Sequence, residues 1–267
     1  MLQLEQAERD AVRHAKVAAQ ALWSQGEMTV LDAAEAAARL GEDSATGGLM
    51  MAGAATVTPA VILDHWLAVT EVLKAEAASF EARPEGGWRV LDADGALLCE
   101  ADAVVVTAGW GVAALAPELG LRPVRGQADW VEGVTAAAAA WGGYVAPTAT
   151  GLLFGATHDR EDTATDVRTE DSERNLATLA ARLPRLAEGV STAPRQSRAA
   201  IRATTRDRLP VCGEAPGRPG LFVLGGLGSR GFCVAPLLGE HVAALITGAP
   251  SPLPAAMAAR LGPARLI

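Results

Sequence analysis

The stretches Arg206-Asp-Arg-Leu-Pro-Val-Cys-Gly213 and Gly220-Leu-Phe-Val-Leu-Gly-Gly-Leu-Gly-Ser-Arg-Gly-Phe232 decide the fold of this chain. They predict, in order, a tight turn, a short buried strand and a glycine-rich loop that opens a helix. Such a loop presents several backbone N–H groups and the positive end of a helix dipole to an electron-rich ligand. The sequence therefore predicts a ligand-facing loop near the end of the chain.

The same loop matches the dinucleotide-binding pattern as Gly226-x-Gly228-x-x-Gly231. That pattern binds a dinucleotide when it opens a strand–helix–strand unit and an acidic residue for the ribose follows about 20 residues later. Only 36 residues follow Gly231, and no Asp or Glu occurs after Glu240. We therefore expect the loop to face something other than an ADP ribose.

Length and composition leave room for one large domain or two interleaved ones in 267 residues. A net charge of −8 does not favour nucleic-acid binding by bulk electrostatics, although arginines cluster at 195–208 and acidic residues at 159–173. No apolar run suggests a membrane span or a signal peptide, so we expect a cytoplasmic protein without a membrane. The odd count and spacing of Cys99, Cys212 and Cys233 predict small buried side chains and no metal site.

Apolar periodicity predicts several helices, at 4–24, from a Thr29-x-x-Asp32 capping box to Gly41, and at 58–79, 171–183 and 231–247. Strands are predicted at 88–91, 96–99, 103–109, 124–131, 143–147 and 151–157. This order indicates an α/β or α+β protein with more than one sheet. An apolar stripe on the 58–79 helix predicts a core face made of Ile62, Trp66, Val69 and Leu73.

Four segments carry a resemblance to a known family: Thr107-Ala-Gly109, Pro123-x-x-Gly126-Gln127, Arg202-x-x-Thr205-x-Asp207-x-x-Pro210 and Gly226-Leu-Gly-Ser-Arg-Gly231. In this order they resemble the D-amino-acid oxidase-like FAD-dependent oxidoreductases, above all the members that modify the wobble uridine of tRNA. The resemblance implies an FAD-binding Rossmann-like portion interleaved with an antiparallel-sheet substrate domain. The ranges implied are 58–115 and 203–267 for the FAD-binding portion, 29–57 and 116–202 for the substrate domain, and 1–28 for an N-terminal helix.

The resemblance also implies FAD as cofactor and gives the matching residues their roles. Gly226, Gly228, Ser229, Arg230 and Gly231 would lie against the isoalloxazine ring, and Thr107, Ala108 and Gly109 would pass beside the cofactor. Arg202 matches an arginine that binds the substrate carboxylate, a task for which the planar guanidinium fork suits arginine better than lysine. A surface or interdomain salt bridge is the alternative role for Arg202.

The chain also departs from the family pattern. Family members begin with a strand and a Gly-x-Gly-x-x-Gly loop that binds the ADP half of FAD, and no such motif occurs here before residue 100. The departure leaves three explanations: a truncated chain, a partner polypeptide that carries the missing N-terminal unit, or a chain that has lost FAD. Exposed apolar edges of a parallel sheet would then favour a homo-oligomer.

Three functions remain open at this point. The first is an FAD-dependent oxidation of the C–N bond of a glycine-like secondary amine, the carboxymethylaminomethyl group of tRNA wobble uridine, by a chain that could be inactive alone. The second is a glycine or D-amino-acid oxidase-like activity on a free small amine, which the net acidity favours. The third is a flavin-free ligand-binding or assembly protein.

Overall fold

A computed structural model describes all residues, 1–267, and divides them into two compact units. The first unit comprises Met1–Glu71, Gly126–His158 and Thr165–Ala200, and the second comprises Val72–Arg125, Asp159–Ala164 and Ile201–Ile267. The chain alternates between the units, so neither is one continuous segment. Helices and several sheets occur together, which confirms the predicted mixed fold class.

The largest sheet has nine strands in the order β12-β8-β11-β10-β9-β1-β3-β2, with β13 paired to β8. Most of these strands belong to the first unit, while β8 and β13 contribute residues to both units. The strands are β1 Leu2–Leu4, β2 Met28–Leu31, β3 Gly48–Met51, β8 Arg122–Glu132, β9 Ala139–Ala140, β10 Tyr144–Pro147, β11 Gly151–Gly155, β12 Asp159–Arg160 and β13 Arg195–Thr204. The predicted strands at 124–131, 143–147 and 151–157 are therefore confirmed as β8, β10 and β11.

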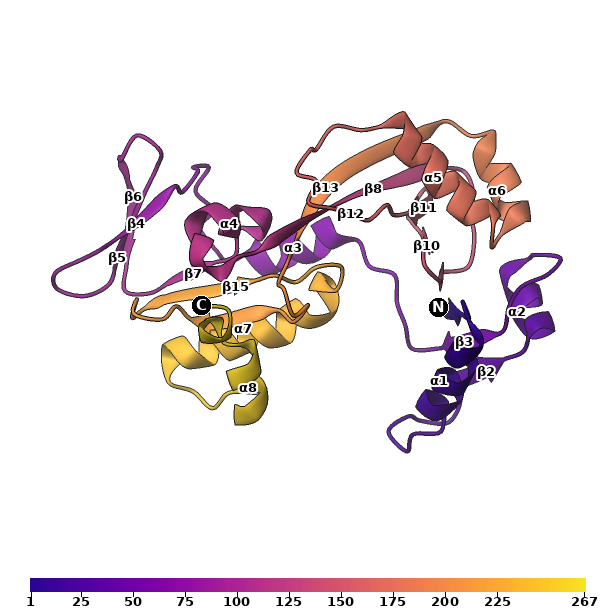
Figure 1. Cartoon of the computed structure of the whole chain (residues 1–267), viewed down its shortest axis with the longest axis horizontal. Helices are drawn as coiled ribbons and strands as arrows, with labels where there is room; N and C mark the ends of the chain where they lie inside the picture. Colours follow the sequence, from indigo (N-terminus) through magenta and orange to yellow (C-terminus); the bar gives the residue numbers. More distant parts are fainter. The chain divides into compact units, whose positions relative to one another are not determined.

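Two helices, α5 Thr169–Ala180 and α6 Pro184–Ser191, cover one face of the first unit's sheet (Figure 1). Alternate residues of a strand share a face, so Leu152 and Phe154 of β11 both point into this core, where they are completely buried. They pack in one cluster with Leu179 of α5 and Val190 of α6, whose exposed fractions are 1% and 0%. The other helices of this unit are α1 Glu8–Ala18, α2 Ala33–Leu40 and α3 Pro59–Leu67.

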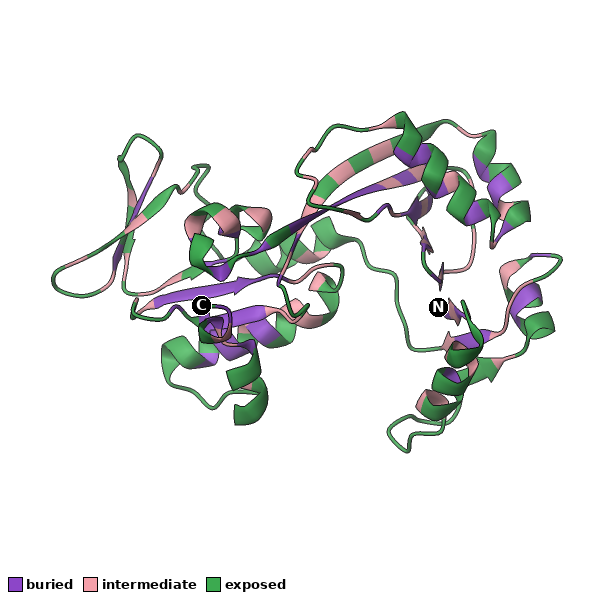
Figure 2. Cartoon of the chain, viewed as in Figure 1, coloured by how far each residue is buried: buried purple, intermediate pink, exposed green.

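The second unit holds two three-stranded sheets, β14-β15-β7 and β4-β5-β6. Its strands are β4 Ser79–Ala82, β5 Trp88–Leu91, β6 Leu97–Ala101, β7 Val104–Val106, β14 Val211–Glu214 and β15 Leu221–Gly225. Its helices are η1 Gly109–Gly111, α4 Val112–Leu115, η2 Pro117–Leu119, α7 Gly231–Thr247, α8 Ala255–Leu261 and η3 Pro263–Arg265. Every residue of β15 is buried (Figure 2), as predicted for the strand that precedes the glycine-rich loop.

Helix α2 begins three residues later than predicted. Asp32, not Thr29, is the N-cap: its carboxylate accepts a hydrogen bond from Glu35 N, and the Glu35 carboxylate accepts one from Asp32 N. Thr29 instead pairs with Met50 in the ladder between β2 and β3. The helix ends at Gly41, as predicted, in the left-handed conformation with φ +72°.

The predicted helix over 58–79 is shorter than expected, and its apolar stripe is not a core face. Helix α3 ends at Leu67 and has no buried residue (Figure 2). Trp66, Val69 and Leu73 have exposed fractions of 50%, 97% and 55%. The first half of the predicted helix does form, as α3. However, no other element packs extensively against its apolar face. Likewise, the predicted helix at 4–24 is the shorter α1, preceded by strand β1.

Candidate functional site

Two loops of the second unit meet at one end of the β14-β15-β7 sheet. Strands β7 and β15 are parallel neighbours, with Val104 opposite Leu221 and Val106 opposite Val223, so their carboxyl ends lie side by side. Thr107, Ala108 and Gly109 follow β7, and the glycine-rich loop follows β15. Open sheets with parallel strands bind ligands at this end. The fold thus brings two predicted segments that are far apart in sequence, Thr107–Gly109 and Gly226–Gly231, to the same edge of the sheet.

The glycine-rich loop needs glycine at two positions. Gly226 and Gly228 have φ values of +62° and +56°, in the left-handed region that side chains disfavour. A Cβ at Gly226 would lie 2.8 Å from Thr205 Cγ2, whereas one at Gly228 would lie 3.6 Å from Thr204 Cγ2. The loop is therefore built around close backbone approach, above all at Gly226.

Helix α7 begins directly after this loop, with Arg230 as an N-cap that makes no side-chain capping bond. The N–H groups of Cys233 and Val234 donate to Arg230 O at 3.0 and 3.2 Å. The N–H groups at Gly231 and Phe232 precede any intrahelical acceptor, so they and the helix dipole favour an electron-rich group at the helix start. Together with the side-chain-free glycines, this arrangement fits the pyrimidine end of a flavin ring.

Arg202 lies on β13 close to this loop. Two residues later, Thr204 forms an isolated antiparallel bridge with Leu227, and Gly228 N donates to Ala203 O at 3.0 Å. The Arg202 side chain is half-buried, and its Nη1 lies 3.5 Å from Arg125 O. The strand that carries Arg202 is thus joined to the glycine-rich loop by backbone contacts at Leu227 and Gly228.

A network of polar contacts fixes the turn that follows β13. The Arg265 Nε donates to Asp207 Oδ2 at 2.8 Å, and Arg265 Nη2 donates to Leu209 O and Pro210 O at 2.9 and 2.8 Å. Thr205 Oγ1 lies within hydrogen-bonding distance of Asp207 Oδ1 and Leu209 O, at 2.8 and 2.6 Å. The Arg265 guanidinium holds the pKa of Asp207 well below its usual range. Sequence reasoning missed Arg265, because its partners lie more than fifty residues away in the chain.

Arg125 is a second residue that sequence reasoning missed. Its side chain is completely buried, its Nε donates to Ala164 O at 3.1 Å, and its Nη1 lies 4.0 Å from Asp159 Oδ2. A guanidinium can be buried only when its charge and donors find partners. We assign Arg125 to holding the 159–164 segment against β8. The one sequence feature that could have pointed to Arg125 is its position beside Gly126-Gln127 of the family motif.

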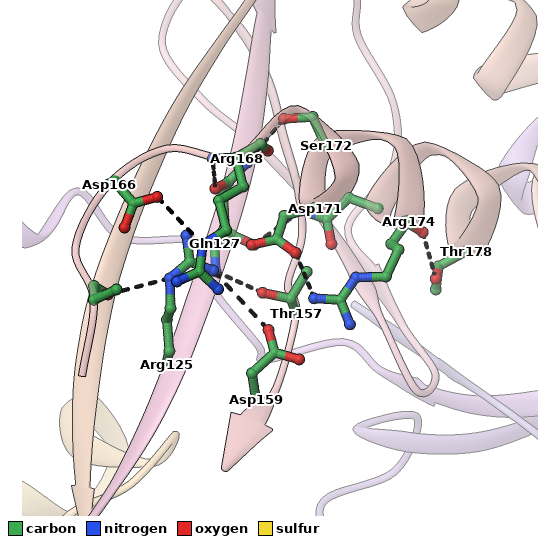
Figure 3. A network of polar contacts seen from close by, with 12 residues as sticks. Arg125, Gln127, Thr157, Asp159, Asp166, Arg168, Asp171, Ser172, Arg174 and Thr178 are labelled. Atoms are coloured by element: carbon green, nitrogen blue, oxygen red, sulfur yellow. Dashed lines mark hydrogen bonds and ion pairs between the residues drawn. The ribbon is translucent and has the colours of Figure 1, made fainter. Parts of the chain in front are cut away.

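Gln127 has a comparable structural role in the first unit (Figure 3). Its Nε2 donates to Arg168 O at 2.8 Å and to Ser172 Oγ at 2.9 Å, and its Oε1 accepts from Arg168 N. Thr157 Oγ1 accepts from the Gln127 backbone N–H at 2.9 Å. These bonds tie β8 to the beginning of α5, so the Gly126-Gln127 motif stabilises the sheet that supports the helices.

The remaining features place limits on the site. An apolar cavity of about 510 Å³ between α7 and α8 is lined by none of the predicted site residues. No group of three or more His, Cys, Asp or Glu side chains gathers where it could hold a metal ion.

The three cysteines differ in their surroundings. Cys212 is buried, which raises its thiol pKa to about 11, but Cys99 and Cys233 are exposed, contrary to the prediction of buried cysteines. No helix combines the length and apolar character needed to cross a membrane.

Comparison with known proteins agrees with the resemblance. The profile of the FAD dependent oxidoreductase family matches residues 1–245. The chain is 54% identical over 267 residues to the tRNA 5-methylaminomethyl-2-thiouridine biosynthesis bifunctional protein MnmC of Caulobacter sp. (strain K31), covering 99% of this chain and 44% of that protein. It is 50% identical to the MnmC protein of Caulobacter vibrioides, covering 95% of this chain and 42% of that protein. The chain thus spans less than half the length of these relatives.

Among solved structures, glycine oxidase from Geobacillus kaustophilus superposes with a TM-score of 0.78 at 25% identity, over 96% of this chain and 73% of that one. The match of both sequence and fold extends across both units, and FAD is the cofactor expected of such proteins. The chain belongs to the D-amino-acid oxidase-like family of FAD-dependent oxidoreductases.

Proposed function

We propose that this chain oxidises the C–N bond of a glycine-like secondary amine, the carboxymethylaminomethyl group on the wobble uridine of tRNA. The observation that carries the proposal is the 54% identity, over nearly the whole chain, to a protein named for the biosynthesis of 5-methylaminomethyl-2-thiouridine in tRNA. Such identity supports a shared substrate class more strongly than the fold does, since one fold serves many substrates.

The substrate group is a glycine whose nitrogen is joined to the uridine through a methylene. Removing a hydride from its α-carbon and a proton from its nitrogen gives an imine, and water then hydrolyses the imine to the aminomethyl base and glyoxylate. When bound, FAD supplies the two-electron oxidant. The protein's main task is then to hold the substrate carboxylate so that the α-carbon is correctly oriented toward the oxidant. The oxidation itself does not require an acidic or basic side chain as catalyst.

The residues at the edge of the β14-β15-β7 sheet suit these tasks. In this proposal Arg202 holds the substrate carboxylate through its guanidinium fork. Gly226, Gly228, Ser229, Arg230 and Gly231 lie against the isoalloxazine ring, with Thr107, Ala108 and Gly109 beside it. The N–H groups at the beginning of α7 favour negative charge on the nearby ring, which develops as the substrate is oxidised.

A second candidate is a glycine oxidase-like activity on a free small amine. The superposition on a glycine oxidase and the net charge of −8 favour it. The two candidates differ in the part of the substrate beyond the glycine unit. They are therefore separated by the ratio of kcat/KM for carboxymethylaminomethyl-modified tRNA to kcat/KM for glycine.

The first experiment is the visible absorption spectrum of the purified chain after incubation with FAD and removal of the excess, followed by a glyoxylate assay. We expect a retained flavin band, and glyoxylate released from modified tRNA much faster than from glycine. Faster release from glycine would favour the second candidate. A colourless protein would contradict both and favour a flavin-free binding or assembly protein.

A further inference from the structure

One face of the first unit's sheet is covered by α5 and α6, and the residues between the core positions point to the other face. On β8, Val131 lies in the core, so the neighbouring Trp130 points to the opposite side. On β11, Leu152 and Phe154 lie in the core and Leu153 between them points away. On β10, Val145 lies in the core, so Tyr144 also points away.

Strand register places these side chains near one another. Trp130 lies opposite Leu153, and Leu153 lies opposite Ala146 on the next strand. In the next row, Ala128 lies opposite Gly155, which lies opposite Tyr144. Trp130, Tyr144 and Leu153 are all partly exposed, and none of them belongs to any of the three hydrophobic cores.

Positive charge borders the same face on the adjacent strand β13. This strand, Arg-Gln-Ser-Arg-Ala-Ala-Ile-Arg-Ala-Thr, contains arginines and no carboxylate. Ser197 Oγ donates to Asp129 Oδ1 at 2.5 Å, on the side of β8 that faces α5. By alternation along the strand, Arg198 therefore points to the side of Trp130. The Arg198 side chain is exposed and has no ion-pair partner in the structure.

We propose that this aromatic face, defined by Trp130, Tyr144, Leu153 and Arg198, binds one unstacked nucleotide of the RNA substrate. The indole of Trp130 stacks on the base, and the guanidinium of Arg198 binds the adjoining phosphate. Every base offers a π-face to an aromatic side chain, and the guanidinium fork matches the geometry of phosphate oxygens. The inference rests on the proposed tRNA substrate and adds the residues that recognise it.

The overall charge does not oppose this inference. A net charge of −8 weakens the long-range attraction of RNA. At physiological salt, however, only charges within about 8–10 Å of a phosphate interact with it strongly. The strand that carries Arg198 has no acidic residue, and the Asp129 carboxylate on β8 points to the α5 side of the sheet, where Asn175 and Ser197 donate to it. The predicted binding is therefore short-ranged and modest in its dependence on salt.

The test measures the affinity of the full chain for a fluorescein-labelled anticodon stem-loop RNA by anisotropy at several salt concentrations. Trp130→Leu should weaken binding by roughly 10-fold at every salt concentration, because base stacking on an aromatic side chain contributes about 1–3 kcal/mol. Trp130→Phe should restore most of the affinity, which also shows that the site still folds. Arg198→Gln should lower the slope of log K against log salt by about 1, because one phosphate contact is lost.

Matched controls are Trp66→Leu on α3 and Arg13→Gln on α1, which replace exposed side chains elsewhere in the same unit. They should leave both affinity and slope unchanged. Wild-type affinity and slope in Trp130→Leu and Arg198→Gln, or no binding of the RNA by the unsubstituted chain, would overturn the inference.

Glyoxylate release from modified tRNA, measured on the same preparations, separates this inference from the proposed function. If both substitutions leave the rate of glyoxylate release unchanged, the proposed function is supported and the aromatic face is not the RNA-binding site. Binding that depends on Trp130 without any glyoxylate release has the opposite meaning: the RNA site stands and the proposed oxidation does not.

Discussion

At the scale of single residues, Gly226 and Gly228 have similar backbone angles but different surroundings. Both have φ near +60°, yet only at Gly226 would a Cβ clash with another residue, 2.8 Å from Thr205 Cγ2. Thr205 cannot turn away cheaply, because its hydroxyl lies 2.8 Å from Asp207 Oδ1 and 2.6 Å from Leu209 O. The requirement for glycine is therefore stricter at Gly226.

Gly228→Ala should lower the free energy of unfolding by about 1–2 kcal/mol, the cost of a side chain in the left-handed region. Gly226→Ala carries the same cost and a steric clash, so its loss should be larger, about 2–4 kcal/mol. Urea unfolding of the two variants gives the comparison. Equal losses would show that the contact with Thr205 does not constrain the loop.

Arg202 gives a sharper test of the chemistry. If its fork holds the substrate carboxylate, Arg202→Lys keeps the charge but loses the paired hydrogen bonds, and KM should rise by roughly 10-fold or more. Arg202→Gln should raise KM further, because it also removes the positive charge that attracts the carboxylate. Steady-state kinetics with the modified tRNA measures both. An unchanged KM in both variants would instead assign Arg202 to a structural salt bridge.

At the scale of elements, the sequence predicted β15, the glycine-rich loop and α7 because all the determinants are local: a short apolar run, glycines and a long, mostly apolar helical segment. It did not predict β13, whose alternating pattern contains arginines and alanines rather than large apolar residues. Nor could periodicity show that the apolar stripe of α3 has no covering partner. A helical pattern fixes which residues share a face, but not what packs against that face.

The network of polar contacts between Arg265 and the turn after β13 predicts a pH dependence. Asp207 has a lowered pKa in the folded state, so its contribution to stability is present above the unfolded value of about 3.9 and is lost as pH falls below it. The unfolding midpoint in urea should therefore drop between pH 5 and pH 3. In Asp207→Asn this part of the drop should disappear, while Arg13→Gln, an exposed control, should behave as the unsubstituted chain. If the unfolding midpoint of Asp207→Asn falls as much as that of the unsubstituted chain, the Asp207 carboxylate does not cause the pH dependence.

Helix α3 and strand β5 offer a contrast between two tryptophans. Trp66 on α3 is 50% exposed, whereas Trp88 on β5 is 5% exposed and its indole donates to Pro219 O at 3.0 Å. Trp88→Ala should cost about 3–5 kcal/mol of unfolding free energy. Trp66→Ala should cost no more than about 0.5 kcal/mol, as is usual for surface positions. Comparable losses in the two variants would mean that the apolar face of α3 is covered in solution.

At the scale of the whole molecule, the candidate site depends on chain topology. Thr107–Gly109 and Gly226–Gly231 meet only because β7 and β15 are parallel neighbours. Periodicity alone could not pair two strands separated by a long segment of chain. The family resemblance implied only that the two segments lie against the same cofactor. The roles of the site residues, the domain ranges and the homo-oligomer stay predictions. The oligomer retains physical support, because β7 lies at a sheet edge and Val105 is 37% exposed.

The most direct test of the account is anaerobic mixing of the FAD-incubated chain with tRNA that carries carboxymethylaminomethyluridine, followed by the visible flavin band. We predict that the chain retains flavin, that the band bleaches on mixing, and that glyoxylate appears in an amount matching the bleached flavin. Tight retention of flavin with no bleaching by this tRNA would contradict the proposed substrate. Absence of any retained flavin would contradict the central claim that this chain works as an FAD-dependent oxidoreductase.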